Sequence, residues 1–530
     1  MPKRSRVEKA AELPEQIDWL VLLIVVAFVV LVRVRLLDLP LERDEGEYAY
    51  AGQLLLQGVP PYSQAYNMKF PGMYVAYAII LATFGQTIAG IRIGLMIVNA
   101  ATIVLLYFLA RRLFGRAAAL IAAASYAIFS LEPTLLALYA HATHFVNLAV
   151  VAALLLLARD RRRWEIIAAG VLLAIAIVIK QQAAAFALFA LVWRPRKWLD
   201  LLTGGASVGV VTAALLAISG VFSRFWLWTI RYATEYVTSA AATSPLEILS
   251  ATVSAIFYFA PLLWLIAGAG LVIAFIAGVD RIFVAGYTLA AIAAIVPGFY
   301  FREHYFIVLL PIASMLIGIA VVFTSKRWSF VPAVVFAIAI LVSLTRMWGT
   351  MFELAPDRIT KLLYRRSPFV EAIDTAAYIH DHTSPSDRIA ILGSEPEIFF
   401  YAQRRSATGY IYTYPLMENQ KFAHQMQTEM IAEITRARPK YIVRVTNAPS
   451  WLRRPESDLT IFNWAQNELQ HGWVLEGIAD IGPEETNWVW GNDAQTYRPK
   501  SADAIAIYRR ADAPSSGPSG HLLPQEGEGL

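Results

Sequence analysis

The chain has 530 residues, 57% of them hydrophobic, and a formal net charge of +5. Soluble proteins average roughly 45–50% apolar residues, so this composition excludes an ordinary soluble protein. The sequence contains no cysteine, which excludes disulfides, thiolate catalysis and cysteine-based metal sites. The positive charges fall mainly in loops between apolar stretches, where they orient a membrane protein, so we expect no nucleic-acid partner.

A transmembrane domain is expected at 17–350, because apolar stretches long enough to span a bilayer recur there. The first stretch lacks the short apolar core and small-residue cleavage site of a secretory signal, so we expect a retained helix. About eleven spans are predicted. Their ranges are 17–36, 88–110, 116–132, 140–158, 164–180, 183–193, 198–219, 252–278, 282–298, 304–324 and 328–346.

The charges of the connecting segments predict the orientation. Alternate connections are basic, as at Lys326-Arg327, whereas the others are nearly balanced. The positive-inside rule places the basic connections and the N-terminal segment 1–16 in the cytoplasm. The long loop 37–87 and the C-terminal part then lie outside. We therefore expect a multi-pass protein of the inner (cytoplasmic) cell membrane with an external, periplasmic C-terminal domain.

The external loop contains two adjacent carboxylates, Asp44 and Glu45, close to the membrane surface. Acidic residues beside a bilayer are costly and often functional. Asp44 also matches a helix N-cap, with Glu47 three residues later completing a capping box, and Gly58 ends the predicted helix. The motif alone therefore leaves open a capped surface helix and an active site.

A second apolar stretch, about a dozen residues long, follows Lys69 in the same loop. It is too short to span a bilayer comfortably, which favours an amphipathic helix in the membrane interface. A lysine at its start would lie at the height of the lipid headgroups. There it either binds an anionic lipid phosphate or serves as a snorkelling anchor.

Ionisable residues also occur at the ends of later spans. Arg92 begins the second span, where an arginine is expensive unless it is paired or faces a cavity. His141 and His144 lie three residues apart on one face of a predicted helix, which suits either metal ligation or structural hydrogen bonding. No third ligand accompanies them in the sequence pattern, so we predict no metal site there. Lys180 ends the fifth span.

The last external turn, 299–305, combines aromatic residues with hydrogen-bond donors. Arg302 has the planar fork that grips a phosphate, and His304 or Tyr305 would add a hydrogen bond. The alternative is an aromatic belt with a cation that caps a helix.

The composition becomes that of a soluble domain from about residue 364, and we place this domain at 364–510. Helical patterns alternate with short apolar strands, which indicates an α/β layer domain. The final stretch, 511–530, is rich in Pro, Gly and Ser and is expected to be disordered. The predicted strands are 388–392, 441–445, 473–479 and 504–508, and the predicted helices are 368–382, 416–438 and 458–470.

Two features of this domain allow a functional and a structural interpretation. The turn 393–397 follows a strand and fits either anion binding at a helix start or a simple cap. The aromatic residues, among them Phe399, Tyr410 and Tyr412, fit either sugar stacking or a core.

Taken in order, these motifs resemble the lipid-linked glycosyltransferases of the GT-C superfamily. More narrowly, they resemble the bacterial and archaeal branch related to protein mannosyltransferases and lipid A aminoarabinose transferases. The resemblance extends over nearly the whole chain, to about residue 510. It rests on Asp44-Glu45, Lys69-Phe70-Pro71, Arg92, Arg111-Arg112-Leu113-Phe114-Gly115, Lys180, Arg302 before Leu309-Leu310-Pro311, and Pro396-Glu397-Ile398-Phe399-Phe400-Tyr401.

The resemblance implies a GT-C-like helical membrane protein with interfacial helices in the first external loop and an external α/β domain. It implies an inverting transfer of a sugar, a hexose or a pentose, from a polyprenyl-phosphate donor. The acceptor would be a hydroxyl of a lipid, a protein or a glycan. Such a transferase would modify proteins or the cell envelope.

The resemblance also implies roles for the singled-out residues. Asp44 would be the general base, and Glu45 and Glu47 would support it. The donor phosphate would be bound by Lys69, Arg302 and Tyr305. Further candidate substrate-site residues are Arg92, His141, His144, Lys180 and His304.

The chain departs from the aminoarabinose pattern at two positions. That branch has a basic residue three positions after the catalytic Asp, where this chain has Glu47. It has an acidic residue before the loop lysine, which helps hold a metal, where this chain has Met68. We therefore expect neither bound zinc nor aminoarabinose, predict no required cofactor and leave a divalent metal open.

Two other function classes fit parts of the sequence. A transporter or flippase for lipid-linked sugars would also have many spans and buried ionisable residues. The long external loop, the external domain and the lack of evident inverted repeats count against it. A non-catalytic scaffold with a glycan-binding external domain would have no reason to place Asp44, Lys69 and Arg302 at one membrane face.

Overall fold

The structure is a computed structural model that describes residues 15–239 and 244–513. The chain divides into two compact units. The predicted N-terminal segment 1–16 lies almost entirely outside the described residues, as does most of the predicted disordered tail 511–530. The first unit comprises 1–37, 93–210 and 245–354, and the second comprises 38–92, 211–244 and 355–530.

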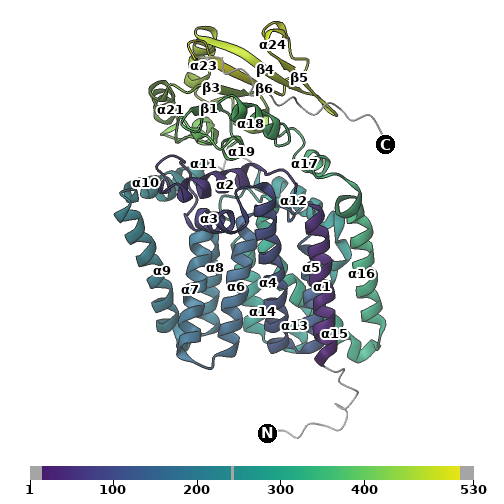
Figure 1. The fold of residues 1–530 in the computed structure, drawn as a ribbon. Coiled ribbons are helices and arrows are strands. Elements are labelled where there is room, and N and C mark those ends of the chain that lie inside the picture. The colour runs from purple at the N-terminus through teal and green to yellow at the C-terminus, as the bar shows by residue number, and fades with distance from the viewer. Residues whose placement is uncertain (1–14, 240–243, 514–530) are drawn as a thin grey trace. The chain divides into compact units, whose positions relative to one another are not determined.

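The first unit is built from apolar helices that run side by side (Figure 1). The division between the units falls inside α4 and α9. The helices are α1 (Glu15–Arg35), α4 (Ile88–Phe114), α5 (Arg116–Phe129), α6 (Ala142–Arg159), α7 (Arg163–Ile179), α8 (Ala184–Trp193), α9 (Trp198–Ile218), α12 (Pro245–Phe259), α13 (Pro261–Ala277), α14 (Arg281–Ala293), α15 (Leu310–Trp328) and α16 (Val331–Trp348).

Glycines let the backbones of these helices approach one another. A β carbon at Gly270 of α13 would lie 2.1 Å from the carbonyl oxygen of Leu316 in α15. One at Gly318 of α15 would lie 2.4 Å from the carbonyl oxygen of Ala118 in α5. Small residues at such crossings are typical of helices that associate in a bilayer, where close packing replaces the hydrophobic effect.

Six helices among the described residues are long and apolar enough to cross a membrane, or up to seven if one bent pair counts as a span. The chain is therefore a multi-pass membrane protein, but the predicted count of about eleven spans is not confirmed. Several predicted spans correspond to shorter apolar helices, including Arg116–Phe129, Gln181–Trp193 and Arg281–Ala293.

The predicted straight span 252–278 is broken. Helices α12 and α13 meet at an angle of 109° around Ala260, and Pro261 is the first residue of α13. Proline has no backbone N–H and its ring clashes with the preceding turn, so a continuous helix cannot pass through this position without a kink.

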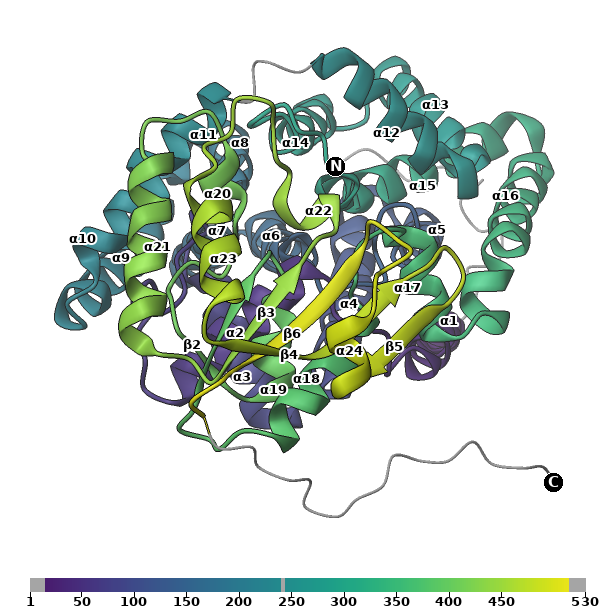
Figure 2. The same ribbon diagram turned by 90° about the horizontal axis from the view of Figure 1, so that it is seen from above.

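The second unit contains a six-stranded mixed sheet in the order β2-β1-β3-β6-β4-β5 (Figure 2). Strand β1 is parallel to β2 and β3, whereas β6 is antiparallel to both β3 and β4, and β5 is antiparallel to β4. The strands are β1 (Arg388–Leu392), β2 (Arg405–Ser406), β3 (Tyr441–Val445), β4 (Trp473–Ile481), β5 (Thr486–Trp490) and β6 (Ala504–Arg510).

Helices surround this sheet, and together they form what we call the α/β layer, residues 355–513. Strands β1 and β3 occupy their predicted ranges, and β4 and β6 begin where predicted and extend further. The two strands at the edges, β2 and β5, were not predicted. The helices are α17 (Pro356–Tyr364), α18 (Glu371–Asp381), α19 (Glu397–Ala402), α20 (Tyr414–Met417), α21 (Ala423–Ala437), α22 (Ala448–Trp451), α23 (Thr460–Gln470) and α24 (Asn492–Thr496).

The second unit also contains two helices from the first loop, α2 (Arg43–Leu56) and α3 (Gly72–Phe84), and two from residues 222–239, α10 (Phe222–Trp226) and α11 (Ala233–Ser239). Helix α2 is packed tightly against α19. A β carbon at Gly46 would lie 2.6 Å from the backbone nitrogen of Glu397. This contact holds the start of α2 against the α/β layer.

Replacing Gly46 with alanine is expected to destabilise the protein. The added methyl group meets backbone atoms that cannot rotate away, and such overpacking costs about 1–3 kcal/mol of unfolding free energy. Gly209→Ala in α9 is the control, because its β carbon meets nothing within 4 Å. A thermal-shift measurement in detergent should give a lower unfolding temperature for Gly46→Ala alone. Equal temperatures for the two variants would contradict the close packing of α2.

Candidate active site

The start of α2 is capped by a different pair of residues from the predicted one. Glu42 is the N-cap: its Oε1 accepts a hydrogen bond of 2.9 Å from the amide of Glu45. Glu45 Oε2 in turn accepts one of 3.2 Å from the amide of Glu42. The predicted capping box of Asp44 and Glu47 is therefore wrong. The helix begins before Asp44, and the Glu47 carboxylate is bound to side chains elsewhere in the fold.

The side chains of Asp44 and Glu47 meet at Lys69. Lys69 Nζ donates to Asp44 Oδ1 at 2.8 Å and to Glu47 Oε2 at 2.5 Å. Tyr74 of α3 donates to the other oxygen of Glu47 at 2.7 Å. Asp44 keeps 26% of its side-chain surface exposed, whereas Glu47 keeps 1%. The pair of Asp44 and Lys69 is thus accessible from outside, with Glu47 beneath it.

The two carboxylates of this cluster stabilise the positive charge of Lys69. Burial by itself lowers the pKa of Lys69, but the adjacent carboxylates of Asp44 and Glu47 outweigh it, and the pKa lies well above its ordinary value. The ammonium also lies 4.5 Å from the centre of the Tyr48 ring, a favourable cation–π position. Lys69 is therefore cationic at neutral pH.

The α/β layer supplies a third partner for Asp44. Tyr412 Oη lies 3.1 Å from Asp44 Oδ1 and 2.9 Å from the carbonyl oxygen of Arg43. Its ring centre lies 5.5 Å from Lys69 Nζ. The sequence identified Tyr412 only as one of several aromatic residues for sugar stacking or a core, because nothing local signals a contact across 368 residues.

Arg92 and Glu45 form a buried ion pair behind this cluster. Their side chains are 3% and 0% exposed, and both Arg92 terminal nitrogens donate to the Glu45 carboxylate. Arg92 also donates to the carbonyl oxygens of Leu39 at 2.9 Å and Pro40 at 3.1 Å. Of the two alternatives that the sequence left open for Arg92, a partner or a cavity, the structure shows a partner. The pair fixes the turn that leads into α2.

The remaining candidate residues lie in the first unit, where four of them form what we call the histidine cluster. The rings of His141 and His304 are stacked, with centres 4.2 Å apart and planes 9° apart. Tyr305 contacts His304 edge-on at 4.8 Å, and Lys180 Nζ lies 4.3 Å above the Tyr305 ring. Imidazole nitrogens are suitable ligands for zinc and other first-row metals, and an ammonium suits an anion.

Two further candidates of the first unit lie near these residues in the chain. Arg302 immediately precedes the short helix Glu303–Leu309, and its guanidinium carbon lies 5.9 Å from the centre of the Tyr300 ring. His144 is completely buried in α6.

The role of Lys69 can be tested by Lys69→Met with a matched rescue. The change leaves the Glu47 carboxylate buried without its cation, and breaking a buried pair costs roughly 3–5 kcal/mol, less where one partner is partly exposed. We expect a lower unfolding temperature and loss of any activity that needs an oriented Asp44. Adding Glu47→Gln should restore the unfolding temperature without the activity. A stable Lys69→Met single variant would contradict the charge balance described above.

Comparisons with known proteins give the following similarities. Residues 69–228 match the family model of dolichyl-phosphate-mannose-protein mannosyltransferase. The apo structure of ArnT from Cupriavidus metallidurans is 14% identical over 94% of this chain and 99% of that one, with a TM-score of 0.59. The chain shares its fold with this protein. No curated protein sequence matches the chain significantly.

Two ligand-bound structures have the same fold. ArnT from Cupriavidus metallidurans bound to undecaprenyl phosphate is 15% identical over 93% of this chain and 98% of that one, with a TM-score of 0.58. Archaeal oligosaccharyltransferase AglB from Archaeoglobus fulgidus, in complex with an inhibitory peptide and a dolichol-phosphate, is 13% identical over 92% and 75%, with a TM-score of 0.52. At these identities the likeness is one of fold alone.

Proposed function

We propose that this GT-C protein is an inverting glycosyltransferase. It moves a hexose or a pentose from a polyprenyl-phosphate donor to an acceptor hydroxyl at the external face of the cell membrane. The observation that carries the proposal is Asp44, a partly exposed carboxylate with one oxygen bound by a cation. The match of residues 69–228 to the dolichyl-phosphate-mannose-protein mannosyltransferase family and the undecaprenyl phosphate bound to ArnT also support it.

Asp44 would act as the general base. The acceptor hydroxyl gives its proton to the Asp44 carboxylate while its oxygen forms a bond to the anomeric carbon of the donor sugar. The bond between that carbon and the phosphate oxygen breaks, and polyprenyl phosphate leaves with the electron pair. Attack opposite the leaving group inverts the anomeric configuration. A positioned base contributes roughly 10²–10⁴-fold to such a step.

The leaving phosphate requires more positive charge than the cluster around Asp44 provides. With Asp44, Glu47 and Lys69 ionised, the cluster has two negative charges and one positive charge. An ammonium has three N–H groups, and two of those on Lys69 point to the carboxylates, which leaves the third for a phosphate oxygen. Following the family resemblance, we propose Arg302 and Tyr305, besides Lys69, as residues that bind the donor phosphate.

The contacts of the remaining candidate residues suggest their roles. Lys180, His304 and His141 form the histidine cluster with Tyr305 and would contact the donor headgroup. Arg92 is bound by Glu45, so we assign this pair to positioning the start of α2. We propose the membrane domain at 17–350 as the catalytic domain and 364–510 as an external domain.

A donor panel tests the proposed function. Purified protein is offered a set of polyprenyl-phosphate sugars, with and without candidate acceptors, and each donor is followed by mass spectrometry. The proposal expects loss of one donor species with the wild-type protein. The panel includes donors that carry hexoses, pentoses and amino sugars. If every donor stays intact with every class of acceptor, the result counts against the proposed function. Movement of an intact donor across the proteoliposome membrane would instead favour a transporter or flippase.

A further inference from the structure

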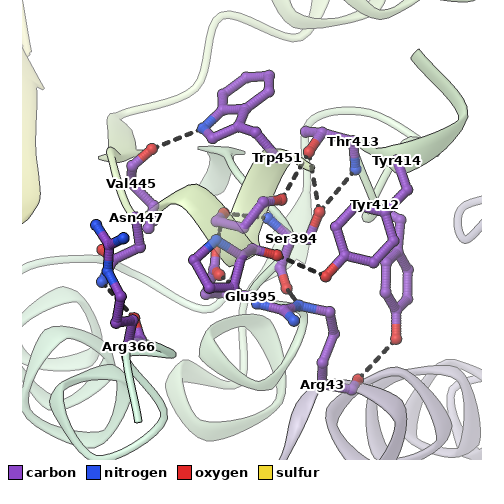
Figure 3. A network of polar contacts seen from close by, with 12 residues as sticks. Arg43, Arg366, Ser394, Glu395, Tyr412, Thr413, Tyr414, Val445, Asn447 and Trp451 are labelled. Carbon is purple, nitrogen blue, oxygen red and sulfur yellow. Dashed lines mark hydrogen bonds and ion pairs between the residues drawn. The ribbon is translucent and has the colours of Figure 1, made fainter. Parts of the chain in front are cut away.

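The α/β layer is joined to the start of α2 by a buried polar network (Figure 3). Arg43 of α2 donates to the carbonyl oxygen of Ser394 at 2.5 Å and to Glu395 Oε1 at 3.0 Å. The guanidinium carbon also lies 5.2 Å from the centre of the Phe369 ring and 5.4 Å from that of Tyr414. The residue next to Asp44 is therefore held from several sides by the α/β layer.

The network continues from Glu395 to the residue next to Tyr412. Glu395 Oε2 accepts a hydrogen bond of 2.7 Å from Ser450 Oγ. Ser450 Oγ in turn accepts one of 2.9 Å from the amide of Ser394. Ser394 Oγ accepts a hydrogen bond of 3.0 Å from the amide of Thr413. The Thr413 hydroxyl donates to the carbonyl oxygen of Ser450 at 3.0 Å. Ser394, Glu395, Thr413 and Ser450 are all completely buried. One connected network thus fixes both Arg43 and Thr413, the chain neighbours of Asp44 and Tyr412.

Tyr412 connects the α/β layer directly to the Asp44 carboxylate. Burial raises the pKa of Tyr412 well above its ordinary value, and the nearby Asp44 and Glu47 carboxylates raise it further. The phenol therefore keeps its proton and is the donor. It shares this proton between the Arg43 carbonyl oxygen and Asp44 Oδ1, the same Asp44 oxygen that Lys69 approaches.

We propose that Tyr412 is a positioning residue for Asp44, so that the α/β layer is part of the catalytic apparatus. The proposal rests on the proposed function of Asp44 as general base. Two donors from different parts of the chain, Lys69 and Tyr412, meet at Oδ1 and fix the orientation of the carboxylate. A hydrogen bond to an ionised group contributes more than one between neutral groups, and a base in a fixed orientation needs no reorganisation when the acceptor binds.

The test compares Tyr412→Phe with Tyr441→Phe. Both changes remove one phenolic oxygen and keep the ring. Tyr441 of β3 is also buried in the α/β layer, but it donates to Glu476 Oε2 at 2.9 Å and takes no part in the network around Arg43. We expect Tyr412→Phe to lower kcat roughly tenfold, with the KM for the donor and the unfolding temperature close to wild type. Tyr441→Phe should keep the wild-type kcat.

A second comparison separates positioning from a general effect on the fold. If Tyr412 acts through Asp44, adding Tyr412→Phe to Asp44→Asn lowers the residual rate no further, because coupled residues are not additive. An unchanged kcat in Tyr412→Phe, equal losses in both phenylalanine variants, or a fully additive double variant would each overturn the inference. Equal rates for wild type and Asp44→Asn would overturn the proposed function on which it rests.

Discussion

Asp44→Asn is expected to reduce sugar transfer to a small residual rate in a protein that folds and inserts normally. The amide has nearly the same shape as the carboxylate but cannot accept the acceptor proton, so the rate should fall by roughly 10²–10⁴. The Asp44 side chain is 26% exposed and is not the cap of α2, so its loss should cost little stability. Transfer rate and unfolding temperature are measured on the same preparation.

Asp38→Asn is the matched control for this variant. Asp38 lies six residues earlier in the same loop and is exposed, and it undergoes the same change from carboxylate to amide. It should transfer sugar at the wild-type rate. An Asp44→Asn protein as active as Asp38→Asn would remove Asp44 from the role of base.

Arg92→Met is expected to have the largest effect on stability. It leaves the Glu45 carboxylate, which is 0% exposed, without its cation, and it removes the donors to the carbonyl oxygens of Leu39 and Pro40. Breaking a buried ion pair in this way typically costs about 3–5 kcal/mol. The expected result is a clearly lower unfolding temperature in detergent, together with lower activity because α2 carries Asp44.

The paired variant shows whether the uncompensated charge is the cause. Adding Glu45→Gln to Arg92→Met removes the buried charge while the amide oxygen can still accept the Glu42 amide, so much of the lost stability should return. A single variant that unfolds at the wild-type temperature would contradict a structural role for the pair. It would favour instead the substrate-site role that the sequence leaves open.

The error in the predicted cap of α2 illustrates a limit of local sequence rules. Glu42 with Glu45 and Asp44 with Glu47 have the same spacing. N-cap preferences favour Asp over Glu, so local propensity selects the pair that the structure does not use. The choice depends on Lys69 and Tyr74, which bind the Glu47 carboxylate from residues more than twenty positions away.

Most features of the site that could not be predicted from the sequence depend on contacts between residues far apart in the chain. The cost of an unpaired arginine near a membrane predicts that Arg92 either has a partner or faces a cavity, but it does not identify Glu45, 47 residues earlier. Tyr412 is less predictable still, because a tyrosine in a soluble layer is usually part of a core. The buried strands β1 and β3 could be predicted from their short, mostly apolar runs. Strand β2 has only two residues, too few for any periodicity to appear.

Release of polyprenyl phosphate is the most direct measurement of the central claim. Wild-type protein in proteoliposomes receives the donor that the panel identifies, together with an acceptor, and both free polyprenyl phosphate and glycosylated acceptor are quantified. We predict that the two products form in equal amounts and that both form roughly 10²–10⁴-fold more slowly with Asp44→Asn. Disappearance of the donor from one leaflet without release of polyprenyl phosphate, or equal release by both proteins, would contradict it.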